Sequence, residues 1–451
     1  MGILFGTDGV RGIANVELTP EMAFDLGRAG SYVLAQQDSS ARPRIMVGKD
    51  TRVSGDMLEA ALLAGICSTG ADALTLGVIP TPAVAFLTQQ YQASCGVVIS
   101  ASHNPVQDNG IKFFGPNGYK LPDEIEAQIE SLVLAGTRDL IRPQGAEVGR
   151  VYDVAEAINR YVKFLTSCYN QKQDLCNLTV VLDCANGAAY QAAPLVWKAL
   201  GARVIAINDQ PNGININDRC GSTNTTGLKN AVIQHKAHLG IAYDGDADRC
   251  IAIDERGNEL DGDYIMAICA LDMFRRGALK PSRIAATVMS NIGLDIALKR
   301  EGIQVDSCAV GDRYVLEKMM ETGALLGGEQ SGHIIFLEHA TTGDGLLSSL
   351  KLAEVMQRTG LSLSELAREM GKQPQMLVNI KLEDKDTILA HSLVTQSLQQ
   401  AERKLGEQGK LVVRPSGTEP LVRIMAQGPY QYLLEEVIGD IRKAIQAAQQ
   451  A

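Results

Sequence analysis

The sequence predicts an α/β protein with three related mixed α/β-sandwich domains followed by a C-terminal α+β domain. Its 451 residues correspond to about three domains of roughly 150 residues each, or to four smaller ones. Apolar residues make up 45% of the chain and charged residues 21%, which is typical of globular proteins and excludes disordered, collagen-like and coiled-coil classes. Short β-branched runs alternate with longer helical patterns along most of the chain, as in α/β domains.

The first α/β domain is expected to cover residues 1–150. A helical pattern over residues 57–68 separates its first two predicted strands. The β-branched runs predict strands at Ile45–Val47, Leu74–Val78 and Gly96–Ser100.

The second and third α/β domains are expected at residues 151–254 and 255–370, because polar stretches at 142–149 and 254–259 interrupt the alternation. A helical pattern at 294–300 lies within the third domain. The predicted strands are Thr179–Asp183, Arg203–Ile207, Leu239–Tyr243, Arg283–Val288 and Ala324–Gly327.

The C-terminal domain, residues 371–451, has a different pattern. Helices are expected at 391–405 and 430–448. Strands are expected at Met376–Leu382, Lys410–Val413 and Leu421–Met425. This order predicts an α+β unit.

The net charge and the cysteine content limit the expected class of binding partner and the expected cellular compartment. A net charge of -10 gives no support to binding nucleic acid or an anionic membrane, so a small molecule is the expected partner. Nine cysteines without a CxxC pair fit reduced core thiols. No charged leader precedes an apolar stretch, and the long uncharged run at 73–102 contains Pro80 and Pro82. We therefore expect a cytoplasmic protein.

Three aspartates, Asp244, Asp246 and Asp248, occupy every second position of a short segment between two apolar runs. Like charges this close require a cation, and oxygen ligands suit Mg²⁺. An EF-hand fails because Arg249 stands where its sharp turn needs Gly and because both flanks are predicted strands. A solvated acidic turn is the alternative interpretation.

A predicted strand ends at Ser100-Ala-Ser102-His103-Asn-Pro, and Lys112 follows shortly after. Such a turn can present backbone N–H groups together with a hydroxyl, as a phosphate-accepting serine requires. An ordinary turn remains open as an interpretation, and His103 could act by fixing the loop without transferring a proton.

Other polar loops complete the candidate set. Arg414-Pro-Ser416-Gly417-Thr418-Glu-Pro and Arg423 suit a phosphate dianion, because guanidinium groups bind its oxygens in pairs; a surface turn with an ion pair is the alternative. The segment Gly327–His333 suits sugar hydroxyls, and Phe5–Gly12 adds a glycine-rich loop that carries Arg11.

Five of these segments, in this order and approximate spacing, resemble the α-D-phosphohexomutase superfamily over essentially the whole chain. They are Phe5–Gly12, Ile99–Pro105 with Asp108–Lys112, Asp244–Arg249, Gly327–His333 and Arg414–Pro420. The segment Gly328–His333, with Gln330, resembles the branch that acts on glucosamine phosphates. Phosphomannomutase/phosphoglucomutase relatives usually have Met in place of Gln330. The segment Val310–Val315 replaces a Gly-His segment of those relatives.

The resemblance implies four domains around one central cleft and assigns roles to the loops. Ser102 would be the phosphoserine nucleophile and, with Asp244, Asp246 and Asp248, would hold one Mg²⁺ per subunit. Arg11, Lys112 and His103 complete the implied catalytic set. The implied substrate-binding residues are Arg249, Glu329, Ser331, His333, Arg414, Ser416, Gly417, Thr418 and Arg423. Five of these residues are cations, which would give an anionic sugar phosphate a locally positive cleft in an acidic protein.

The implied reaction interconverts glucosamine 6-phosphate and glucosamine 1-phosphate through a 1,6-bisphosphate that turns end for end. It would supply amino-sugar precursors for UDP-N-acetylglucosamine and cell-wall synthesis, with glucose or glucosamine 1,6-bisphosphate as activator. A homodimer is left open. Two alternatives remain: a phosphomannomutase/phosphoglucomutase, and a non-catalytic protein that binds a sugar phosphate or a metal.

Overall fold

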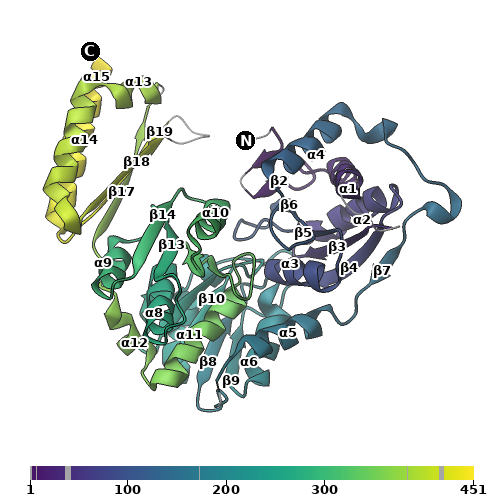
Figure 1. Ribbon diagram of the computed structural model, residues 1–451, viewed down its shortest axis with the longest axis horizontal. Coiled ribbons are helices and arrows are strands. Elements are labelled where there is room, and N and C mark those ends of the chain that lie inside the picture. The colour runs from purple at the N-terminus through teal and green to yellow at the C-terminus, as the bar shows by residue number, and fades with distance from the viewer. Residues whose placement is uncertain are drawn as a thin grey trace.

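The structure is a computed structural model that describes residues 3–6, 8–35, 42–171, 173–382, 384–415 and 421–450. Four β-sheets follow one another along the chain, and Figure 1 shows the four units arranged in an arc, with the first and the fourth at its two ends. The first three units are α/β domains and the fourth is an α+β domain, as the sequence predicts.

The first sheet has seven strands and is covered by helices on both faces. In spatial order its strands are β1 (Phe5–Gly6), β2 (Gly9–Ile13), β6 (Asp108–Phe114), β5 (Cys95–Ile99), β3 (Arg44–Lys49), β4 (Asp72–Val78) and β7 (Val151–Asp153). Its helices are α1 (Pro20–Ala35), α2 (Ser54–Cys67), α3 (Thr81–Gln90) and α4 (Asp123–Ala135). Alternation along β3 points Ile45 and Val47 toward α1 and α2, and Met46 toward α3.

The second sheet contains three strands at the predicted positions. Its order is β12 (Glu259–Leu260), β11 (Cys250–Asp254), β10 (Leu239–Tyr243), β8 (Thr179–Asp183) and β9 (Arg203–Ile207). Its helices are α5 (Ala157–Cys168), α6 (Ala189–Ala199) and α7 (Thr226–His235). Two short strands lie across the expected domain limits: β7 pairs with β4 of the first sheet although it follows residue 150, and β12 pairs with β11 although it follows residue 254.

The third sheet has four strands, two of which the sequence pattern did not predict. Its order is β14 (Gln304–Cys308), β13 (Arg283–Thr287), β15 (Leu326–Gly328) and β16 (Ile334–Phe336). Its helices are α8 (Gly262–Arg275), α9 (Ile292–Arg300), α10 (Asp312–Thr322), α11 (Gly345–Thr359) and α12 (Leu363–Leu366). The unpredicted strands are β14, whose partly exposed residues Gln304–Ser307 are mostly polar, and β16, a buried strand of only three residues.

The same strand order recurs in the three α/β units. The orders β6-β5-β3-β4, β11-β10-β8-β9 and β16-β15-β13-β14 match, each with three parallel strands and one antiparallel strand that returns from a hairpin. This repetition shows that the three units are related. The equivalent hairpin loops of the three units contain Ser102, Asp244–Arg249 and Glu329–His333, so the fold carries three candidate loops at one topological position.

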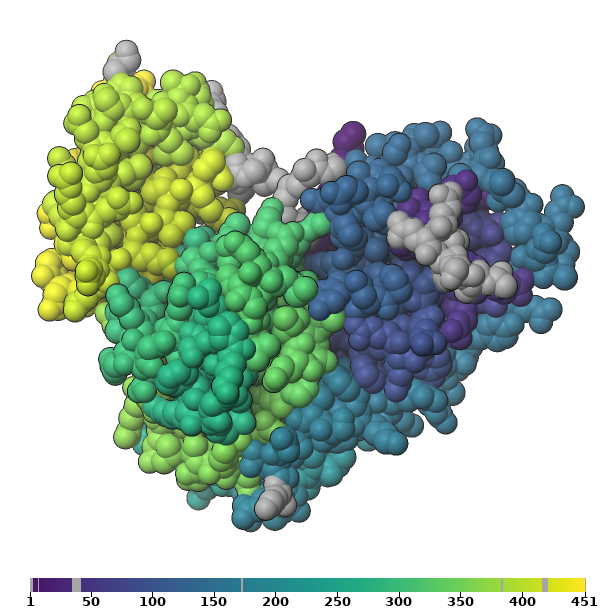
Figure 2. Space-filling view, in the orientation of Figure 1, coloured from purple at the N-terminus to yellow at the C-terminus, as the bar shows by residue number. Residues whose placement is uncertain are grey.

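The fourth unit is an antiparallel sheet in the order β17 (Gln375–Lys381), β19 (Leu421–Gln427), β18 (Lys410–Pro415). Helices α13 (Lys385–Ala390), α14 (Ser392–Leu405) and α15 (Gln431–Gln450) cover it. Its apolar core is separate, whereas one continuous core runs through parts of the first three units. In Figure 2 the fourth unit accordingly forms a lobe of its own, which meets the rest of the molecule along the third unit.

Candidate active site

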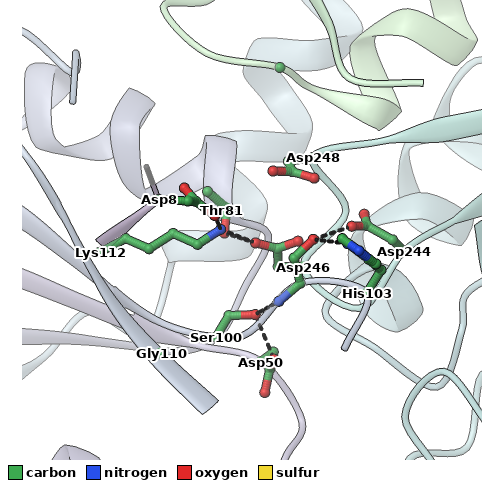
Figure 3. A network of polar contacts seen from close by, with 12 residues as sticks. Asp8, Asp50, Thr81, Ser100, His103, Gly110, Lys112, Asp244, Asp246 and Asp248 are labelled. Carbon is green, nitrogen blue, oxygen red and sulfur yellow. Dashed lines mark hydrogen bonds and ion pairs between the residues drawn. The ribbon is translucent and has the colours of Figure 1, made fainter. Parts of the chain in front are cut away.

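The serine of the first hairpin loop and the acidic loop of the second unit meet in the interior. Ser102 follows β5 and donates a hydrogen bond from Oγ to Asp244 Oδ2 at 2.6 Å, and both residues are buried. Figure 3 shows Asp244 among the surrounding polar groups, with Asp246 and His103 close by. A buried hydroxyl and a group of carboxylates from two different domains are therefore in direct contact.

The backbone at Ser102 is in the left-handed region, with φ at 52°, which costs roughly 1–2 kcal/mol for a residue with a side chain. Neighbouring groups hold this conformation. Ser100 Oγ accepts from Ser102 N at 2.9 Å and donates to Asp50 Oδ2 at 2.6 Å. The hydroxyl of Ser100 is thus occupied within the loop, while that of Ser102 faces the acidic residues.

The three aspartates fit a hard divalent cation. One carboxylate oxygen of each of Asp244, Asp246 and Asp248 lies within 4.8 Å of the others, and all three residues are buried. Asp246 Oδ1 and Asp248 Oδ1 are buried without a hydrogen-bond partner. Burial first, and then the charges of the other two aspartates, raise the pKa of Asp244 well above its ordinary value. Mg²⁺ would satisfy the orphaned oxygens and remove this repulsion.

Lys112 and Arg11 lie beside this cluster. Lys112 Nζ is 3.0 Å from Asp246 Oδ2 and 3.0 Å from Asp8 Oδ2. Burial alone would lower the pKa of Lys112, but the charges of Asp246 and Asp8 outweigh it and raise the pKa above its ordinary value. Arg11 pairs with Asp8 as well. The structure thus brings both predicted cations to the serine and the acidic loop.

Two histidines border the site in different surroundings. His103 Nδ1 is 3.4 Å from Ser102 Oγ, and burial together with the charges of Arg249 and Arg11 lowers the pKa of His103 to about 4. His333 is buried, its Nδ1 is 3.4 Å from Asp248 Oδ2, and its Nε2 accepts from Gly343 N at 3.1 Å. The neutral His103 can assist the serine, whereas His333 supports the acidic loop from the third unit.

The third hairpin loop lines a cavity of about 420 Å³ that opens onto the cluster. Arg11, His103, Asp248, Arg249, Glu329 and His333 are among its lining residues. Glu329 Oε1 accepts from Gly311 N at 3.1 Å, and Glu329 Oε2 accepts from Ser331 Oγ at 3.3 Å. The cavity lining therefore combines the carboxylate of Glu329 with the guanidinium groups of Arg11 and Arg249, which suits a sugar phosphate.

The predicted phosphate-binding segment of the fourth unit is described only in part. Arg414 on β18 lies directly opposite Arg423 on β19. Like charges in cross-strand positions are unfavourable, and an anion between them would relieve the repulsion. Ser416, Gly417 and Thr418 lie outside the described residues.

Several residues around the site escaped the sequence analysis. Asp8 gathers Lys112, Lys120 and Arg11, and Lys120 also pairs with Asp312 of the third unit. Thr81 Oγ1 donates to Asp246 Oδ2 at 2.7 Å. Sequence position gave one signal: Asp50 and Arg52 come within five residues after the predicted strand Ile45–Val47, much as the chosen loops follow their strands.

Comparison with known proteins identifies the family. Four models of phosphoglucomutase/phosphomannomutase domains match the chain: domain I at residues 2–139, domain II at 159–257, domain III at 261–373 and the C-terminal domain at 377–444. A protein from Syntrophomonas wolfei named phosphoglucosamine mutase is 75% identical over 100% of both chains. The chain belongs to the phosphoglucosamine mutase family.

Further relatives and solved structures agree with this membership. A phosphoglucosamine mutase from Desulforamulus reducens is 53% identical over 99% of each chain. A crystal structure of a phosphoglucomutase/phosphomannomutase family protein from Burkholderia thailandensis matches with a TM-score of 0.80 at 24% identity, covering 98% of this chain and 97% of the other. An Aspergillus fumigatus N-acetylphosphoglucosamine mutase, solved with GlcNAc-6P and magnesium, matches with a TM-score of 0.69 at 17% identity, covering 99% and 96%. These two structures show the shared fold.

Membership of the phosphoglucosamine mutase family makes the chain an enzyme of the phosphohexomutase type. All nine cysteines are free thiols, as the sequence predicts, and most of them are buried. Among the described residues, no helix is both long and apolar enough to cross a membrane.

Proposed function

We propose that this member of the phosphoglucosamine mutase family interconverts glucosamine 6-phosphate and glucosamine 1-phosphate with Ser102 as the phosphoryl carrier. The observation that carries the proposal is the contact between Ser102 Oγ and Asp244, in which a buried serine faces a three-carboxylate cluster beside a cavity lined by guanidinium groups. In the first transfer the phosphoserine gives its phosphoryl group to O1 of the sugar. The resulting 1,6-bisphosphate reverses its orientation in the site, and its 6-phosphate is then transferred to Ser102.

We assign Asp244, Asp246, Asp248 and the phosphate of Ser102 as the groups that would hold one Mg²⁺. A cation there supplies charge stabilisation for the phosphoryl oxygens during transfer. Asp244 Oδ1 also accepts from Arg249 N at 3.2 Å, so the acidic loop holds the backbone of the arginine that faces the cavity.

The side chains around the cavity then divide the remaining tasks. Arg249 is assigned to the reacting phosphate. Arg11 and Lys112 stabilise charge and assist proton movement at the sugar oxygen, and the neutral His103 lies next to the serine oxygen. Glu329 and Ser331 hold the sugar hydroxyls, with His333 supporting them.

The fourth unit is assigned to the phosphate that does not react. Arg414 and Arg423, with Ser416, Gly417 and Thr418, would bind it in either orientation of the bisphosphate. Phosphoryl transfer depends mainly on positioning and charge stabilisation, which these groups would supply. Closure of the fourth unit over the cavity would also exclude water from the phosphoserine. Glucose or glucosamine 1,6-bisphosphate would act as activator by rephosphorylating Ser102, and the free thiols favour a cytoplasmic location.

A coupled assay with glucosamine, glucose and mannose phosphates tests the substrate. The proposal predicts the highest kcat/KM for the glucosamine phosphates and loss of turnover in Ser102→Ala. Preference for mannose or glucose phosphate would instead favour a phosphomannomutase/phosphoglucomutase. Binding without turnover of any of the three would indicate the non-catalytic alternative.

A further inference from the structure

Two backbone carbonyls next to the phosphoryl-carrying serine each accept two side-chain hydrogen bonds. Arg52 Nη2 donates to Ser102 O at 3.0 Å and to Asn104 O at 2.8 Å. Asn217 Nδ2 donates to the same two oxygens, at 2.9 Å and 3.1 Å. The two donors come from different units, since Arg52 follows β3 and Asn217 lies between β9 and β10.

Arg52 directs four of its five guanidinium bonds to carbonyls between Ser102 and Asp108 and the fifth to Asp50. The side chain is fully buried, and Nε donates to Asp50 Oδ2 at 2.9 Å. Nη1 donates to Pro105 O at 2.5 Å and to Asp108 O at 3.1 Å. With the two bonds of Nη2, the five N–H donors of the guanidinium make five bonds. Burial of a charged group is unfavourable unless it is paired and fully hydrogen-bonded, so this arginine and the serine loop form one closed unit.

Asn217 connects that unit to the domain of the acidic loop. The backbone of Gly245, between Asp244 and Asp246, packs so closely here that an added Cβ would lie 2.4 Å from Ser102 O and 2.9 Å from Asn217 Nδ2. The serine loop and the acidic loop thus meet backbone to backbone, and Asn217 supplies side-chain bonds across the junction.

We propose that Arg52 and Asn217 are positioning residues for Ser102: Arg52 holds the shape of the serine loop, and Asn217 fixes that loop against the acidic loop of the second domain. The inference rests on the proposed role of Ser102. In that role the serine oxygen must occupy the same place in both transfers, before and after the bisphosphate reverses its orientation. A small displacement of the loop therefore impairs both steps.

Two variants test the proposal. Arg52→Lys keeps a positive charge beside Asp50 but has at most three donors in place of a planar five-donor group. Asn217→Ala removes the bonds across the domain junction, and its companion Asn217→Gly removes the same bonds without a Cβ at the left-handed φ of 58°. We expect kcat to fall on the order of 100-fold in Arg52→Lys and roughly tenfold in Asn217→Ala, with KM unchanged within a factor of about three for both. The double variant should lose less than the product of the single losses, because both side chains bind the same carbonyls.

Matched controls separate positioning from a general structural effect. Arg44→Lys alters an arginine of the same domain that donates to the carbonyls of Tyr91 and Gln92. Asn215→Ala alters the same loop as Asn217, in which Asn215 Nδ2 donates to Gln210 O at 3.0 Å. Both controls should keep the kcat of the wild type. An equal loss of kcat in the controls would overturn the proposal.

Intact-mass measurement distinguishes failure of this inference from failure of the proposed function. If the wild type carries no phosphoryl group on Ser102 during turnover, the proposed function fails and the inference with it. If Ser102 is phosphorylated and Asn217→Ala keeps the wild-type kcat, only the positioning role is wrong. Asn217→Ala decides the question even where Arg52→Lys does not fold, and the thermal unfolding temperature of each purified variant shows that the folded state is compared.

Discussion

At the scale of single residues, the acidic loop gives the sharpest prediction. Asp246 binds Thr81 and Lys112 through Oδ2, while its buried Oδ1 has no hydrogen-bond partner. Asp246→Asn should lower kcat by on the order of 100-fold or more, because the site loses a charged ligand. The unfolding temperature in chelator should stay close to that of the wild type, since weaker repulsion among the carboxylates offsets the loss of the Lys112 ion pair.

Metal removal checks the same assignment on the unmodified enzyme. Chelator-treated wild type should be inactive, and added Mg²⁺ should restore its turnover. Full turnover in chelator would show that the three aspartates do not serve a required metal.

The residues that the sequence predicted stand in dense polar motifs, whereas the missed Arg52 shares with them only a position after a predicted strand. Ser102, Asp244 and Lys112 stand in dense polar motifs beside predicted strands, and the structure brings all three together. Arg52 and Asn217 act on backbone carbonyls 50 and 115 positions away. No spacing in the sequence records such contacts, because they arise only when the hairpin loops of two domains meet.

At the scale of elements, the start of helix α8 carries a buried acidic group. Asp263 Oδ2 accepts from Asn291 N at 2.8 Å. Burial and the charge of Asp261 raise the pKa of Asp263 to about 7, whereas an unfolded aspartate titrates near 3.9. The folded state is therefore the stronger proton binder between these values. The contribution of Asp263 to the free energy of unfolding is complete below about pH 4 and is lost as the pH rises through about 7.

Asp263→Asn removes this titration and keeps an acceptor for Asn291. The variant should exceed the wild type in free energy of unfolding at pH 8 by up to about 4 kcal/mol, and the difference should shrink toward pH 4. Chemical denaturation at pH 4, 6 and 8 measures it. A difference that is constant over this range would contradict the account of Asp263.

The strands show why element prediction succeeded in some places and failed in others. The strands β8, β9 and β10 have the predicted bounds, because each is a short, mostly apolar run in a sheet covered by helices. β14 is an edge strand of mixed exposure, and its Asp306 and Ser307 are residue types that strands seldom favour. Only its partner β13 identifies it as a strand.

At the scale of the whole molecule, the fourth unit is joined to the third by a small set of polar contacts. Asn291 Nδ2 donates to Gln373 O at 3.0 Å, and Gln427 Oε1 accepts from Ile292 N at 2.6 Å. The fourth unit has its own apolar core. A polar junction between separate cores is the arrangement expected for domains that move relative to one another.

Arg414→Ala tests whether this unit binds the non-reacting phosphate. Loss of one charge-assisted contact costs about 1.5–3 kcal/mol, so kcat/KM should fall by roughly one to two orders of magnitude. The Haldane relation requires a similar loss in the forward and reverse directions. Phosphorylation of Ser102 should survive, because the serine lies in another domain. Unchanged kinetics for both glucosamine phosphates would refute the assignment.

The repeated strand order of the three α/β units explains how one site is assembled from distant segments. Hairpin loops at one topological position supply the serine, the acidic cluster and the loop proposed to bind the sugar. The sequence predicted the loops and the domain types, but the equivalence of the loops depends on strand pairing, which only the sheets reveal.

The central claim is that Ser102, and no other residue, carries the transferred phosphoryl group. Intact-mass analysis of purified enzyme after incubation with a hexose 1,6-bisphosphate tests it most directly. The wild type and Ser100→Ala should show a species about 80 Da heavier, the mass of one phosphoryl group, and glucosamine 6-phosphate should discharge it. Ser102→Ala should show none. A phosphorylated species that persists in Ser102→Ala, or that disappears in a folded Ser100→Ala, would contradict the account.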